Sequence, residues 1–106
     1  AGSLLALSPR PTAVCCISDE NAIPLVHALR SYGFRVPEDI SVIGFDDWPM
    51  AQALNISTVR HDPRSYGALA ADAAIPLLRG EILTESCIVV PTTLMLRGTT
   101  GPAPRD

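Results

Sequence analysis

The segment RVPEDISVIGFDD, residues 35–47, carries the most structural information in this chain. Its pattern predicts a turn, a buried strand over 40–45, and two carboxylates, Asp46 and Asp47, directly after that strand. In an open α/β sheet, the carboxyl ends of the strands border the crevice in which ligands bind. A carboxylate there can accept paired hydrogen bonds from the hydroxyls of a small polar ligand. The segment therefore predicts a ligand site at the end of a strand.

The preceding residues predict the other half of a strand–helix–strand unit. Residues 12–17 (TAVCCI) form a short apolar run typical of a strand covered on both faces. Ser18 and Asp19 then offer capping groups to a helix that ends at Gly33. Pro24 leaves two alternatives open, a helix that begins later or a distorted first turn. We expect an α/β fold in which helices flank a Rossmann-like parallel sheet. The apolar stripe of the helix would be Ala22, Leu25, Val26 and Leu29.

The rest of the chain predicts further alternation of helices and strands. Residues 48–54 predict a short helix, and residues 56–59 a strand. Asp62 and Pro63 are an N-cap and first-turn pair that opens a helix closed by Gly80. The apolar face of this helix would be Tyr66, Leu69, Ala70, Ala73 and Leu77. The last expected elements are strands at 87–90 and 93–96 and a frayed tail at 101–106.

Composition limits the classes of function. The chain has 106 residues, 47% of them hydrophobic, and a net charge of -3, which indicates one folded domain without the basic surface of a nucleic-acid binder. All eight basic residues are Arg, so Schiff-base chemistry, a Walker-type phosphate site and a phosphoacceptor of the receiver type are excluded. Two His and three Cys show no metal-site or disulfide spacing, and free cysteines fit a reducing cytoplasm. We expect no enzyme activity, no cofactor, no metal and no membrane span.

Four segments, taken in order, resemble one known family. They are residues 11–14, 33–47, 57–62 and 91–100, and together they resemble the effector-binding domain of lactose/galactose-repressor transcription regulators. The resemblance implies two Rossmann-like lobes, akin to periplasmic sugar-binding proteins, that close on a small effector. It also implies that DNA is bound only through a helix-turn-helix that this sequence does not contain. On this interpretation the chain is a fragment of a two-lobed sensor.

The resemblance also assigns the parts of the chain. Residues 1–11 would be a linker or the tail of a preceding helix, and residues 12–100 the carboxyl-terminal part of the effector-binding domain. The helix after Asp62 would then lack the sheet against which it packs. We expect copies of this chain to cover that surface for one another, as a homodimer or higher oligomer, by domain swapping about 60–62. Within the domain, 12–59 would be the carboxyl-terminal lobe, 60–62 a crossover, 63–92 elements of the amino-terminal lobe, 93–100 a returning strand, and 101–106 a tail.

Asp46 is the leading candidate for the ligand site. It occupies the family's position for an aspartate that accepts hydrogen bonds from effector hydroxyls, and the resemblance implies that role. The alternative is that Asp46 caps the turn into the following helix. We expect Asp47 to act as the cap instead.

Four further residues are candidates for ligand contact. Ser18 stands where the family places an asparagine, which indicates either a different effector or a helix cap. Asp19 is as readily a cap as a ligand contact. Trp48 would stack on a sugar face or pack partly buried, and His61 would lie near the cleft or in an exposed loop.

The first helix carries the expected dimer interface. By resemblance, this helix and the segment after Asp47 pack against their counterparts across a two-fold axis. The alternative is that Leu25 and Leu29 pack inward and the other residues are simply exposed. The expected contact residues are Ile23, Val26, His27, Arg30 and Leu54.

The leading functional prediction is the ligand-sensing and dimerisation part of a bacterial DNA-binding transcriptional regulator. It would bind a small polar effector such as a sugar, and it would perform no chemistry. The alternative is a sugar-binding protein of a transport system with the same fold. The sequence lacks an export signal, which favours the regulator.

Overall fold

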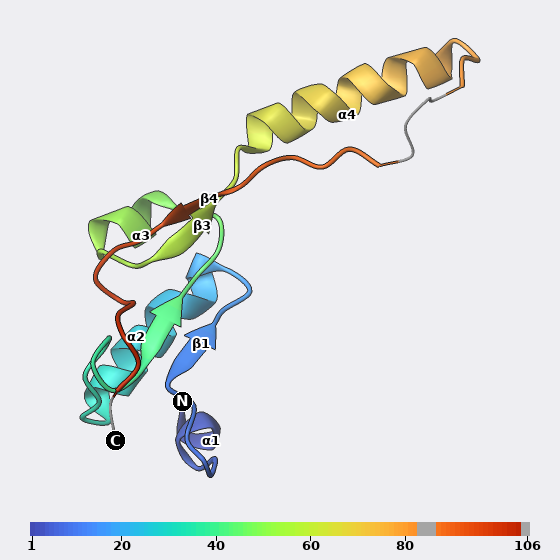
Figure 1. The fold of residues 1–106 in the computed structure, drawn as a ribbon. Helices are drawn as coiled ribbons and strands as arrows, with labels where there is room; N and C mark the ends of the chain where they lie inside the picture. The colour runs from blue at the N-terminus through green and yellow to red at the C-terminus, as the bar shows by residue number, and fades with distance from the viewer. Residues whose placement is uncertain (83–86, 105–106) are drawn as a thin grey trace. The chain divides into compact units, whose positions relative to one another are not determined.

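The computed structural model describes residues 1–82 and 87–104 and divides the chain into two compact units. One unit consists of Ala1–Arg60 with Thr93–Asp106, and the other of His61–Thr92. Figure 1 shows the elements in chain order. The first unit contains α1 (Gly2–Leu5), β1 (Ala13–Cys15), α2 (Asp19–Ser31), β2 (Ser41–Ile43), α3 (Pro49–Ala53), β3 (Thr58–Arg60) and β4 (Thr93–Met95). The second contains α4 (Pro63–Leu78).

The strands of the first unit are joined in the order β1-β2-β3-β4. β1 and β2 are parallel, with Val14 opposite Val42. Two parallel bridges, Ile43 to Ser57 and Asp46 to Arg60, join the end of β2 to the β3 segment. β3 pairs antiparallel with β4. The parallel β1-α2-β2 unit confirms the predicted Rossmann-like α/β arrangement, while β4 makes the strand set mixed.

The core of the first unit lies between α2 and the strands. Ala22, Val26 and Leu29 recur at helical spacing, so they lie on one face of α2 and are buried together. Ile40, Val42, Ala51, Ile56 and Val36 complete the buried set. The helix runs through Pro24 from Asp19, which excludes a later start. Gly33, at φ +83° after the last turn, confirms the predicted helix end.

Three expectations about the strands and the tail are corrected. The predicted strand at 12–17 is not covered on both faces, because Cys15 is exposed and Val14 only half-buried. Residues 87–90 form no strand, since neither strand pair includes them. The tail is anchored as far as Gly101, whose N–H donates to Ser41 Oγ over 3.1 Å, and residues 102–104 beyond it are exposed.

The second unit is built on α4, as predicted. Asp62 is the N-cap, and its carboxylate accepts hydrogen bonds from the Arg64 N–H and the Ser65 hydroxyl. No residue of α4 is buried. Its apolar face borders a pocket of about 410 Å³ lined by Tyr66, Leu69, Ala70, Ala73, Ile88 and Val90. Within residues 1–82 and 87–104, no helix combines the length and apolar character needed to cross a membrane.

Candidate functional site

The backbone after β2 leaves the ordinary strand conformation at the two predicted carboxylates. Asp46 has φ +106° and Asp47 has φ +58°, both in the left-handed region that L residues seldom adopt. The Asp46 N–H donates to the Val59 carbonyl over 2.9 Å, and the Gly44 N–H donates to the Ser57 carbonyl over 2.9 Å. The bonds to β3 therefore hold a strained turn in place. Backbone strain of this kind is concentrated at functional sites.

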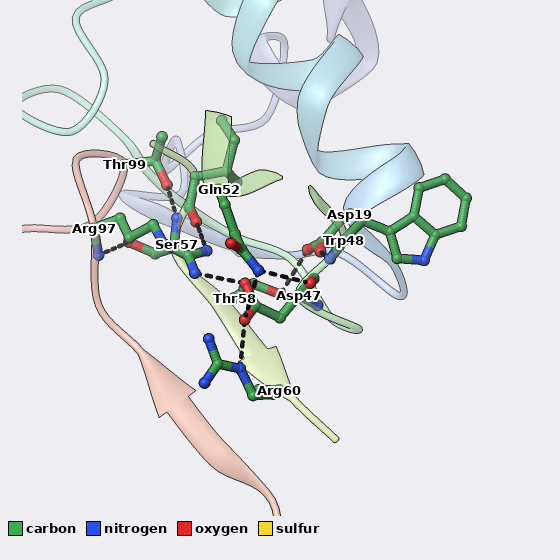
Figure 2. A network of polar contacts seen from close by, with 10 residues as sticks. Asp19, Asp47, Trp48, Gln52, Ser57, Thr58, Arg60, Arg97 and Thr99 are labelled. Carbon is green, nitrogen blue, oxygen red and sulfur yellow. Dashed lines mark hydrogen bonds and ion pairs between the residues drawn. The ribbon is translucent and has the colours of Figure 1, made fainter. Parts of the chain in front are cut away.

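Asp47 is the centre of a buried ion-pair network (Figure 2). Its carboxylate accepts hydrogen bonds from Arg60 Nε and Arg97 Nη2, each over 2.6 Å, and its side chain is only 1% exposed. Burial raises the pKa of Asp47, but the hydrogen bonds from Arg97 and Arg60 outweigh it, so the pKa lies below its ordinary value. The carboxylate is therefore held in its charged form.

The predicted capping role of Asp47 is wrong. α3 has Trp48 as its N-cap, without a side-chain capping bond, and the Asp47 carboxylate turns to the two arginines instead. Sequence reasoning missed this because the partners lie 13 and 50 residues away along the chain.

Asp19 lies inside the fold. It is fully buried, its Oδ1 accepts a hydrogen bond from Thr58 Oγ1 over 2.6 Å, and its Oδ2 accepts one from the Trp48 N–H over 2.8 Å. These bonds tie the start of α2 to β3 and to the start of α3. Both oxygens are used within the protein, which gives Asp19 a structural position, and its role as a ligand contact stays a prediction.

The remaining predicted contacts of the first unit lie at the same strand ends. The Asp19 N–H donates to the Phe45 carbonyl over 2.8 Å, so the segment after β1 runs beside the segment after β2. Ser18 is half-buried, and its Oγ accepts a hydrogen bond from Asn21 Nδ2. Asp46 is half-buried as well, and Trp48 is 46% exposed. In Figure 2 the Trp48 ring extends away from the polar network. The structure thus brings Ser18, Asp46 and Trp48 to one edge of the sheet.

His61 belongs to the second unit. Its ring stacks on Tyr66, with centroids 5.2 Å apart and planes 10° from parallel. The side chain is half-buried rather than fully exposed in a loop. Its role as a ligand contact stays a prediction.

A second polar cluster, which the sequence did not reveal, fixes the carboxyl-terminal segment to the sheet. Thr99 is buried, its Oγ1 accepts from the Ser57 N–H over 2.9 Å, and it donates to the Val42 carbonyl over 2.7 Å. Ser57 Oγ in turn accepts from the Arg97 N–H over 2.8 Å. This cluster sets the position of Arg97 beside Asp47. Residues 57–62 and 91–100 had been singled out by resemblance, but nothing in their spacing indicates these pairings.

The residues expected to form a dimer face lie around one pocket. It has a volume of about 380 Å³ and combines apolar side chains with an imidazole and a guanidinium. Val26 is only 3% exposed, so it contributes mainly to the core. Leu29 is fully buried, Leu25 is half-buried and Leu54 is 48% exposed, as the alternative expected. The lining residues are Ile23, Pro24, Val26, His27, Arg30, Leu54 and Ile56.

The described residues offer no group of three or more His, Cys, Asp or Glu side chains placed to hold a metal ion. The three cysteines are free. Burial, with a smaller contribution from Cys15, raises the pKa of the Cys16 thiol. A thiol with a raised pKa is a poor nucleophile, so Cys16 behaves as a small apolar residue.

Comparison with known proteins connects this geometry to a family. Residues 2–100 match the family described as periplasmic binding protein-like domain. The lactose operon repressor of Rhizobium radiobacter is 35% identical over 99 residues, which are 92% of this chain and 87% of that protein. The arabinose metabolism transcriptional repressor of Geobacillus stearothermophilus is 42% identical over 71 residues, 65% of this chain. This chain spans only 20% of that repressor and 29% of two further curated repressors.

Solved structures agree with the sequence relatives. A LacI family transcriptional regulator from Bifidobacterium animalis subsp. lactis superposes with a TM-score of 0.86 at 34% identity, covering 96% of this chain and 38% of its own. The dimeric Lac repressor with an 11-residue carboxyl-terminal deletion gives a TM-score of 0.75 at 31% identity, covering 90% of this chain and 35% of its own. All these relatives are transcriptional repressors or regulators rather than enzymes, which confirms that expectation.

Proposed function

We infer that this chain, which belongs to the LacI family of transcriptional regulators with a periplasmic binding protein-like domain, senses a sugar and forms a dimer. The single observation that carries the sensing role is the half-buried Asp46 carboxylate on a strained turn at the carboxyl end of β2. The transport alternative is not retained, because the relatives named above are repressors. Operator binding by the whole protein belongs to the same proposal.

The chemistry of the strand edge favours a polyhydroxylated ligand. A carboxylate accepts two or more hydrogen bonds from neighbouring hydroxyls, and these charge-assisted bonds are strong. The half-exposed Trp48 indole offers an apolar face for the C–H side of a sugar ring. Ser18 adds a hydroxyl at the same edge. Relatives named for lactose and arabinose support a sugar as the ligand class.

Substitution of Asp46 tests the sensing role. In the full-length protein, Asp46→Ala should weaken binding of the preferred sugar about tenfold to a hundredfold, the worth of one or two hydrogen bonds to a charged group. The measurement is isothermal titration with a panel of sugars that includes L-arabinose and lactose. Asp39→Asn is the matched control, because Asp39 pairs with Arg35 at the surface and lies outside the strand edge. Unchanged affinity of Asp46→Ala would remove Asp46 from the site.

The dimerisation role is supported by the pocket on α2. Its lining combines apolar side chains with the polar His27 and Arg30, as protein interfaces do. The exposed apolar side chains of α4 in the second unit give a further surface for a partner copy, by the predicted domain swap about 60–62. A solved relative described as a dimer supports this proposal.

Light scattering over a range of concentrations tests dimerisation. The wild-type chain should be a dimer or larger, and Ile23→Asp should shift it toward monomer, because a charge would be buried in the interface. Leu96→Asp is the control, since Leu96 is exposed and does not line this pocket. A compact monomer at every concentration would contradict the proposal.

A further inference from the structure

The Asp47 carboxylate joins three places that are distant in sequence. Asp47 follows β2, Arg60 ends β3, and Arg97 follows β4. Both bonds to the arginines are 2.6 Å long, so the carboxylate is held from two sides. In chain order, β3 leads out to residues 61–92 and β4 leads back from them. The ion pairs therefore connect the turn after β2 to the end of β3 and to the segment after β4.

This network holds a turn that is costly in isolation. A left-handed backbone is unfavourable for a residue other than glycine, and two such residues stand in succession at Asp46 and Asp47. A strained backbone conformation persists only where several surrounding interactions hold it in place. The hydrogen bond from the Asp46 N–H to the Val59 carbonyl restrains the backbone of the turn. Arg60 and Arg97 restrain the turn through the side chain of Asp47.

We propose that Asp47 is a positioning residue: its ion pairs with Arg60 and Arg97 lock the turn that presents Asp46 to the ligand. Asp47 is buried and fully engaged, so it touches no ligand itself. The Arg97 side chain is 14% exposed and Arg60 49%, so the pair with Arg97 is the better shielded from solvent. The ligand role of Asp46, on which this rests, is the function proposed above.

Hydrogen exchange tests the lock without any ligand. In the full-length protein, Asp47→Asn should speed exchange of the peptide covering residues 44–48 on the order of tenfold to a hundredfold, because two charge-assisted bonds are weakened. The reference is the α2 peptide 25–32, which should keep its wild-type rate. Asp39→Asn, which removes an exposed ion pair outside this turn, should not change exchange at 44–48 relative to exchange at 25–32.

Two outcomes of the exchange experiment would overturn the proposal. Unchanged exchange at 44–48 would mean that Asp47 does not restrain the turn. An equal increase in both peptides would mean that Asp47 supports the whole unit rather than this turn. If Asp47→Asn does not fold, Arg60→Gln provides the same test. Because the Arg60 side chain is half-exposed, this substitution removes one ion pair of Asp47 with little change to the buried core. A smaller acceleration confined to 44–48 is then expected.

A double-mutant cycle tests whether Asp47 acts through Asp46. With the panel sugar that binds the wild type best, Asp47→Asn should weaken binding about tenfold when Asp46 is present and less than about twofold in Asp46→Ala. Equal losses in both backgrounds would show that Asp47 acts independently of Asp46, against the proposal. If Asp46→Ala binds as the wild type does, or no sugar binds, the proposed function fails while the exchange rates still decide whether Asp47 locks the turn.

Discussion

Gly44, directly after β2, lies close to the first turn of α2, and an added methyl group should be costly there. A Cβ at this position would lie 2.1 Å from Asp19 Oδ1, 3.1 Å from Asp19 Cα and 3.2 Å from Ala22 Cβ. The Asp19 side chain cannot move aside freely, because it is fully buried and bonded to Thr58 and to the Trp48 N–H. Gly44→Ala must therefore displace helix backbone or break a buried hydrogen bond.

The magnitude follows from those two alternatives. Overpacking of a well-packed site costs about 1 to 3 kcal/mol. Loss of the 2.6 Å bond between Thr58 and the Asp19 carboxylate adds about 1.5 to 3 kcal/mol. We expect Gly44→Ala to incur both costs and to lower the free energy of unfolding by about 2.5 to 6 kcal/mol.

Urea unfolding measured by fluorescence is a suitable assay, because Trp48 is the single tryptophan and lies beside Asp19. Gly33→Ala is the control within the same unit. A Cβ on Gly33 meets no atom within 4 Å, so only its left-handed backbone resists alanine, at about 1 to 2 kcal/mol. A Gly44→Ala loss no larger than that of Gly33→Ala would refute the close approach of α2 to β2.

Two further outcomes test the core and the ion pairs. Leu29→Ala should lower the free energy of unfolding by about 2 to 5 kcal/mol in the same urea assay, because the Leu29 side chain of α2 is fully buried in the core. A decrease below about 1 kcal/mol would contradict that packing. Acid should destabilise the fold, because the hydrogen bond from Arg35 lowers the pKa of Asp39 to about 2 and the arginine pairs lower that of Asp47. Depressed folded-state pKa values contribute stability above the unfolded value of about 3.9, and that stability is lost as the pH falls toward about 2. Unfolding free energies from pH 5 to pH 2 should therefore decrease, and Asp39→Asn should flatten part of the decrease; a pH-independent stability would contradict both ion pairs.

The local elements were readable from sequence because their signals are local. Helical spacing of Ala22, Val26 and Leu29 defined the buried face of α2, and Gly33 marked its end. The strand before Asp46, β2 at Ser41–Ile43, is predicted by one apolar run followed by two carboxylates. The prediction of a strand at 87–90 is wrong because an apolar run indicates burial but does not show that a neighbouring strand is available for pairing.

Side-chain partners were predicted less well, since partner choice depends on the completed sheet. Asp47 was expected to cap a helix because capping needs only the residues next to it. Its actual partners become neighbours only once β3 lies beside the end of β2 and β4 beside β3. The same holds for Asp19, whose bond to Thr58 spans 39 residues. The two adjacent carboxylates after β2 therefore have different positions: Asp46 lies on the turn that we propose meets the ligand, and Asp47 is buried and paired with Arg60 of β3 and with Arg97 after β4.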